Sequence, residues 1–176
     1  MRGPDLTTAV LIPAVVSLAS SLLITGAGWW WAWRRKQRDD HARLLADAWA
    51  AVQSYKEFAF AIPRRNPNDP AAERVRLSEA IRHVQQDLSF HTAWIRGVST
   101  RVSIRYDELV GETRDTAGKL MREAWQHPPI TTDTGMNLPE IAAELATLRP
   151  AETAYLNAVQ RHLHPLRWRL RRTRRT

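Results

Sequence analysis

The chain has 176 residues, of which 44% are hydrophobic and 25% are charged, and its formal net charge is +8. This is the composition of an ordinary folded protein, which argues against wholesale disorder. The absence of cysteine excludes disulfides, thiol catalysis and cysteine-based zinc sites, and it suits a reducing cytoplasm.

A transmembrane helix is predicted over residues 8–33. No charged residue occurs from Leu6 to Trp33, a run of 28 residues, whereas about 20 residues suffice to cross a hydrocarbon core of roughly 30 Å. The run ends in aromatic residues typical of a membrane interface, Trp29, Trp30, Trp31 and Trp33, and a basic flank follows it: Arg34, Arg35, Lys36 and Arg38. Because basic flanks stay in the cytoplasm, we expect a single-pass protein of the cell (inner) membrane, with residues 1–7 outside and residues 34–176 inside.

A cleaved signal peptide is the alternative interpretation of this segment. Thr25-Gly26-Ala27 resembles a cleavage site, but the bulky, cationic sequence that follows it opposes export, and the first residues lack a strongly basic region. The signal-anchor interpretation is therefore favoured.

Small residues recur along one face of the predicted span, at steps of three and four residues. They are Ala14, Ser17, Ser21, Thr25 and Gly28. Such a face lets two membrane helices approach closely, so it predicts self-association of the span.

Residues 34–166 are predicted to form a cytoplasmic bundle whose first helix covers residues 34–62. Its apolar stripe alternates by three and four residues: Leu45, Ala48, Val52, Tyr55, Ala59 and Ile62. The helix should end at the proline-rich breaker 63–70, after which Asp69 is a plausible N-cap with Pro70 in the first turn.

Two further helices are expected over residues 70–96 and about 100–126. One apolar stripe consists of Leu77, Ile81, Val84, Leu88, His91, Ile95, Val98 and Val102, and beyond it a second stripe continues as Tyr106, Leu109, Thr113, Ala117, Leu120 and Ala124. The phase slips by one residue between them, beside the weak helix formers Gly97-Val98-Ser99-Thr100. A break there gives four helices, whereas an unbroken helix gives the alternative, a long coiled-coil hairpin.

The last helix is predicted over residues 138–170, with Asn137 as its N-cap, Glu140 as the capping-box acid and Pro150 as a kink or restart. The predicted fold class is therefore all-α, with one transmembrane helix and an antiparallel four-helix bundle. An even number of bundle helices returns the C-terminus to the bilayer.

The chain after residue 166 forms a basic tail. Six arginines fall within its ten residues, where no acid occurs: Arg167, Arg169, Arg171, Arg172, Arg174 and Arg175. Without them the net charge falls from +8 to +2, so the high pI describes a tail and not a basic domain. Together with Trp168 these residues are expected to contact anionic lipid headgroups, with nucleic-acid binding or simple solvation as alternatives.

No catalytic, cofactor-binding or metal-binding constellation is found in the sequence, so an enzyme and a cofactor are not expected. His91 lies on the core stripe, where we expect either a buried structural histidine or a pH-responsive one. Trp49, Trp94 and Trp125, one per helix, are expected to line the core or a groove.

The favoured function is that of a non-enzymatic, membrane-anchored interaction or scaffold protein, acting as a homo-oligomer or with another protein partner. The first alternative is a membrane-tethered nucleic-acid-binding accessory that uses the basic tail. The second is a small membrane-perturbing or lysis factor, in which residues 1–38 are the active part.

Overall fold

The computed structural model describes the backbone of residues 6–164 and the side chains of residues 29–164. Every regular element in this part is helical, which confirms the all-α class. The α-helices are α1 (Leu6–Ala61), α2 (Pro70–Val98), α3 (Thr100–Gln126), α4 (Pro139–Leu145) and α5 (Arg149–Leu163). Two short 3-10 turns accompany them, η1 (Thr134–Met136) and η2 (Ala146–Leu148).

The chain divides into two units at the Asp40–His41 bond, and α1 contributes to both. In the first unit the backbone is helical from Leu6 onward. The side chains of residues 8–28, including the small-residue face Ala14, Ser17, Ser21, Thr25 and Gly28, lie outside the described part. Among the side chains that are described, no helical stretch has both the length and the apolar character needed to cross a bilayer.

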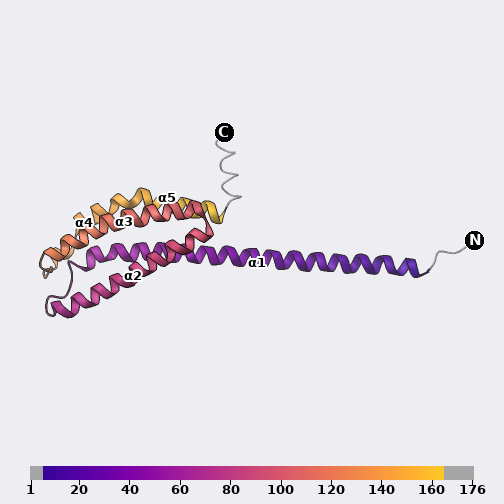
Figure 1. Cartoon of the computed structure of the whole chain (residues 1–176), viewed down its shortest axis with the longest axis horizontal. Coiled ribbons are helices and arrows are strands. Elements are labelled where there is room, and N and C mark those ends of the chain that lie inside the picture. Colours follow the sequence, from indigo (N-terminus) through magenta and orange to yellow (C-terminus); the bar gives the residue numbers. More distant parts are fainter. Residues whose placement is uncertain (1–5, 165–176) are drawn as a thin grey trace, which may run out of the picture. The chain divides into compact units, whose positions relative to one another are not determined.

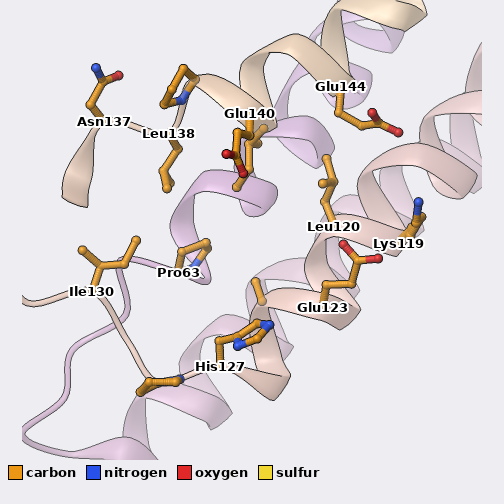
Figure 2. A pocket seen from close by; sticks show the side chains of 14 residues that line it. Pro63, Lys119, Leu120, Glu123, His127, Ile130, Asn137, Leu138, Glu140 and Glu144 are labelled. Carbon is orange, nitrogen blue, oxygen red and sulfur yellow. The ribbon is translucent and has the colours of Figure 1, made fainter.

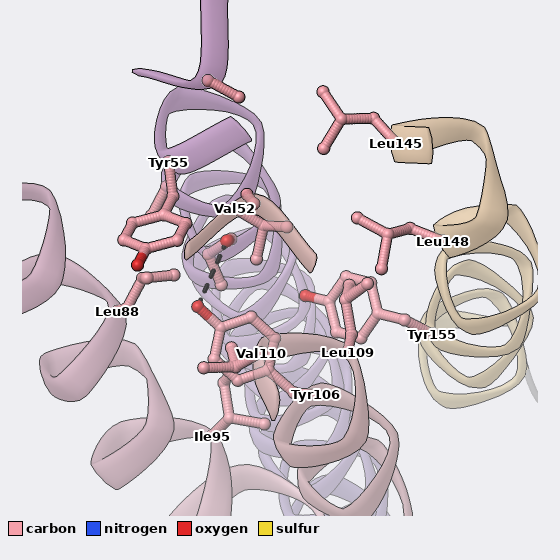
Figure 3. Packing of buried hydrophobic residues seen from close by; sticks show 14 of the residues in the cluster. Val52, Tyr55, Leu88, Ile95, Tyr106, Leu109, Val110, Leu145, Leu148 and Tyr155 are labelled. Atoms are coloured by element: carbon pink, nitrogen blue, oxygen red, sulfur yellow. Dashed lines mark hydrogen bonds between the residues drawn. The ribbon is translucent and has the colours of Figure 1, made fainter. Parts of the chain in front are cut away.

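The second unit is the predicted helical bundle. Within it the end of α1, α2, α3 and the α4–α5 segment run up and down alongside one another (Figure 1). Figure 3 shows the core between them, where the predicted stripe residues of α1, α2 and α3 meet Leu145, Leu148 and Tyr155 of the last segment. Because the stripes follow the helical period, their burial confirms the predicted faces.

Two buried tyrosines join α3 and α5 to α1. The Tyr106 hydroxyl donates a hydrogen bond to the carbonyl of Ala48 at 3.2 Å, and the Tyr155 hydroxyl donates to that of Leu45 at 2.8 Å. The two rings lie 5.5 Å apart, and Tyr155 also stacks on Trp49 at 6.2 Å. Burial raises the pKa of both hydroxyls well above the usual range, so both remain donors at any physiological pH.

The break between α2 and α3 lies at Ser99, which confirms the four-helix prediction and shows the long-helix hairpin to be wrong. Ser99 has extended backbone angles (φ −165°, ψ 116°), and its Oγ accepts from the Val102 N–H at 3.5 Å. Its own N–H donates to the Ile95 carbonyl at 3.0 Å and closes α2. One residue therefore ends one helix and caps the next.

Substitutions at this break and two residues before it should have opposite effects on stability. Ser99→Ala removes the cap of α3 and is expected to cost about 0.5–1 kcal/mol of stability. Gly97→Ala should stabilise by about 0.5–1 kcal/mol, because Gly97 is helical and a Cβ there would have no atom within 4 Å. Thermal unfolding of the full chain followed by circular dichroism measures both. A loss of stability on Gly97→Ala would show that glycine itself is needed at the break.

The last helical segment differs from its prediction at two places. Asn137 is exposed and does not cap α4; Leu138 occupies the N-cap position without a side-chain hydrogen bond, so that capping prediction was wrong. The predicted single helix is divided by η2, and α5 restarts with Pro150 in its first turn, as predicted. The predicted extension of this helix beyond His164 lies outside the described residues.

Two arginines of the α1–α2 connection, Arg64 and Arg65, donate hydrogen bonds to backbone carbonyls at the end of the bundle where α1 and α3 terminate. Arg65 donates to the carbonyl of Ile62 at 3.0 Å, to that of Ala124 at 3.1 Å, and to that of His127. Its guanidinium also lies 5.0 Å from the centre of the Trp125 ring. Arg64 donates to the carbonyl of Met136 at 2.6 Å. Arg65 thus satisfies carbonyls at the C-terminal ends of α1 and α3.

Candidate functional site

The best candidate for a functional site in the first unit is the aromatic and basic segment Trp29–Arg38. The exposed fraction of its four tryptophans is 79% for Trp29, 47% for Trp30, 69% for Trp31 and 52% for Trp33. The Arg34 guanidinium lies 4.1 Å above the Trp30 ring, and the Trp30 and Trp31 rings meet edge to face at 5.9 Å. These contacts combine a cation with an exposed aromatic surface.

The basic residues of this segment, Arg34, Arg35, Lys36 and Arg38, are all exposed. By contrast, residues 41–164 hold 15 lysines and arginines and 15 acids, so the bundle has no net charge of its own. The excess positive charge of the protein therefore belongs to residues 1–40 and to the tail. The predicted tail site (Arg167, Trp168, Arg169, Arg171, Arg172, Arg174 and Arg175) lies outside the described residues.

Of the three tryptophans expected in the core or a groove, Trp49 and Trp125 pack against the core. Trp94 does not, because 59% of its surface is exposed, so the prediction was wrong for this residue. It lies 5.9 Å from Phe90, which is 54% exposed and one helical turn earlier. The pair forms an aromatic patch on the outer face of α2, and exposed aromatic surface of this kind is enriched in protein interfaces.

A cleft of about 610 Å³ lies between the C-terminal end of α3 and the start of α4. Pro63, Leu120, Ile130 and Leu138 make its apolar part (Figure 2). Figure 2 also places the carboxylates of Glu123, Glu140 and Glu144 and the amino group of Lys119 around it. Among the described side chains, no group of three or more histidines, cysteines or acids is arranged to hold a metal ion.

His91 is buried on the core face of α2, as its place in the stripe predicted. Within the described residues its Nδ1 has no hydrogen-bond partner. Burial lowers the pKa of His91 below its ordinary value of 6.5, and the nearby Asp47 and Asp87 oppose that shift. The neutral imidazole is therefore the form that the core favours.

This shift makes the stability of the bundle depend on pH. Because the folded pKa is lowered, the unfolded chain binds the proton more readily, and stability is lost as the pH falls below about 6.5. His91→Leu should therefore reduce the fall in unfolding free energy between pH 8 and pH 5, measured by urea denaturation of the full chain. His83→Gln, at an exposed position of α2, is the control and should leave the pH dependence unchanged. An unaltered slope in His91→Leu would contradict the assignment.

Sequence patterns did not reveal two of the features described above, the contacts of Arg65 and the exposed position of Phe90. Arg65 was part of a breaker, and no local signal shows which carbonyls a breaker arginine will meet. Phe90 lies one residue outside the core stripe and was not singled out.

Comparison of the chain with protein-family models, with curated proteins and with solved structures gave no match.

Proposed function

We propose that this protein is a non-enzymatic, single-pass membrane scaffold whose bundle presents binding surfaces on the cytoplasmic side. The observation that carries the proposal is the exposed cluster of Trp29, Trp30, Trp31 and Trp33 at the end of an uncharged run. In water these four tryptophans leave about half or more of their surface exposed, whereas at a headgroup boundary their rings enter the apolar region and their N–H groups stay hydrated. The basic residues that follow favour an anionic cytoplasmic leaflet.

The neutral bundle supports a role in protein contacts. Its charges balance, so a long-range field that would draw nucleic acid to it is absent from residues 41–164. The aromatic patch of Phe90 and Trp94 offers the apolar, rigid side chains that interfaces use as anchors. A second copy of the chain, or a different cytoplasmic protein, is the proposed partner.

The anchor is tested by placing charge in the uncharged run. Because each arginine at the centre of a span costs roughly 2.5–3.5 kcal/mol on insertion scales, Val16→Arg with Leu22→Arg should release the chain from membranes. Arginine at the exposed bundle positions Ser54 and Ser78 is the matched control and should leave the chain in the membrane fraction. Retention of the Val16/Leu22 variant after a high-salt wash would contradict the anchor.

The orientation can be measured without background, because the chain contains no cysteine. A membrane-impermeant maleimide should label Gly3→Cys in intact spheroplasts and should label Ser78→Cys only after permeabilisation. The reverse pattern would overturn the cytoplasmic placement of the bundle. Crosslinking in native membranes tests the scaffold role, and a chain that is strictly monomeric and free of partners would contradict it.

A further inference from the structure

Two histidines that are far apart in the sequence meet where the bundle begins. His41 is the first residue of the second unit, and His162 lies in the last turn of α5. Nε2 of His162 lies 3.4 Å from Nδ1 of His41, and the rings stack with their centres 5.5 Å apart and their planes 30° apart. Both side chains are half-buried. This contact fastens the end of α5 to α1.

A contact of this kind depends on how many protons the two rings carry. When both rings are neutral, or when one is protonated, an N–H of one ring can donate to the free nitrogen of the other. When both are protonated, each ring has only donors, so the hydrogen bond is lost and two positive charges face each other across 3.4 Å. The contact is therefore compatible with zero or one added proton and incompatible with two.

The surroundings of His162 disfavour positive charge on its ring. Burial is the main cause that lowers the pKa of His162 below 6.5, and the charge of His41 is the second cause. The charged or titratable groups nearest to the pair in the sequence are Asp40 and Arg43 beside His41, and Arg161 and His164 beside His162. Arg96 and Arg105, near the α2–α3 turn, are paired with Asp107 and Glu108.

We propose that His41 and His162 form an acid-sensitive latch, which holds the end of α5 on α1 and opens when both imidazoles are protonated. Opening frees the last turns of α5, which is the helix that precedes the basic tail in the sequence. Because burial lowers the pKa of His162, the closed state is present at neutral and alkaline pH and is lost on acidification. The latch concerns the bundle alone and does not rest on the membrane anchor.

The latch is tested by distance measurement between spin labels on the full chain in detergent. Ala46→Cys on α1 and Gln160→Cys on α5 are both exposed and report on the latch. One narrow distance distribution is expected at pH 8, and a second, longer population is expected at pH 5. His162→Gln stays neutral at both pH values, so its distribution should not change with pH. His83→Gln should behave as the unsubstituted chain does.

A second reporter pair distinguishes the latch from general unfolding. Ser78→Cys on α2 and Gln126→Cys on α3 are exposed, and neither helix carries a latch histidine, so their distance should be the same at pH 8 and pH 5. A constant distance between residues 46 and 160 over this range would overturn the latch. So would a pH-dependent change that persists in His162→Gln or that appears equally in the second pair.

Discussion

Replacing Tyr155 by alanine is expected to destabilise the bundle by about 3–5 kcal/mol, the range for large aromatic truncations in a core. The side chain is fully buried, stacks on Trp49, contacts Tyr106 and donates to the carbonyl of Leu45. Its loss leaves a cavity at the point where α1, α3 and α5 meet. Urea unfolding of the full chain, followed by circular dichroism, measures the change in unfolding free energy.

Two controls separate the ring of Tyr155 from its hydroxyl. Tyr155→Phe keeps the ring and should cost only about 1 kcal/mol, because the Leu45 carbonyl still accepts its bond within α1. Leu156→Ala, at a neighbouring position that is 41% exposed, should cost less than about 0.5 kcal/mol. Equal losses for Tyr155→Ala and Tyr155→Phe would show that the hydroxyl, and not the packing of the ring, dominates.

The second large effect is expected at Arg65. Arg65→Ala should cost about 2–3 kcal/mol, because it leaves three carbonyls at helix ends, those of Ile62, Ala124 and His127, without their charged donor. The contact with the Trp125 ring is lost as well. The same denaturation experiment measures this loss.

Neighbouring substitutions show whether geometry or charge matters. Arg65→Lys keeps the charge but not the planar fork of donors, so it should recover only part of the loss. Arg64→Ala removes the same charge from an exposed residue with one hydrogen bond, and about 1 kcal/mol or less is expected. If Arg64→Ala and Arg65→Ala were equally destabilising, the closing role of Arg65 would be refuted.

Predictions from sequence were most successful where the cause is local. The Asp69 side chain accepts from the N–H of Ala72, as expected of an N-cap, and Pro150 restarts a helix. Caps and prolines act on the residues beside them, so a short window of sequence contains the whole cause. Asn137 shows the limit of this reasoning. It was expected to be the N-cap, but the helix begins at Pro139 with Leu138 in the N-cap position, and the Asn137 side chain is exposed.

Burial was predictable by face and not by degree. Leu77 and Leu88 of α2 are buried, whereas Ile81 and Val84 of the same stripe are only partly covered. The helical period determines which side chains share a face, but the width of the covered strip depends on how closely the neighbouring helices approach. The exposure of Trp94 has the same cause, since Trp94 is 59% exposed although its neighbour Ile95 is buried.

The amino-acid sequence by itself determined the all-α class and the faces that pack, and it favoured a break before α3, because these follow from residue period and from helix propensity and capping within a few residues. Only the tertiary structure decided that Arg65 would meet the ends of two helices, that Phe90 and Trp94 would remain on the surface, and that His41 would meet His162. Those contacts join residues separated by 59 and by 121 positions, or depend on which face stays uncovered. No local pattern contains that information, because it arises only when the helices pack.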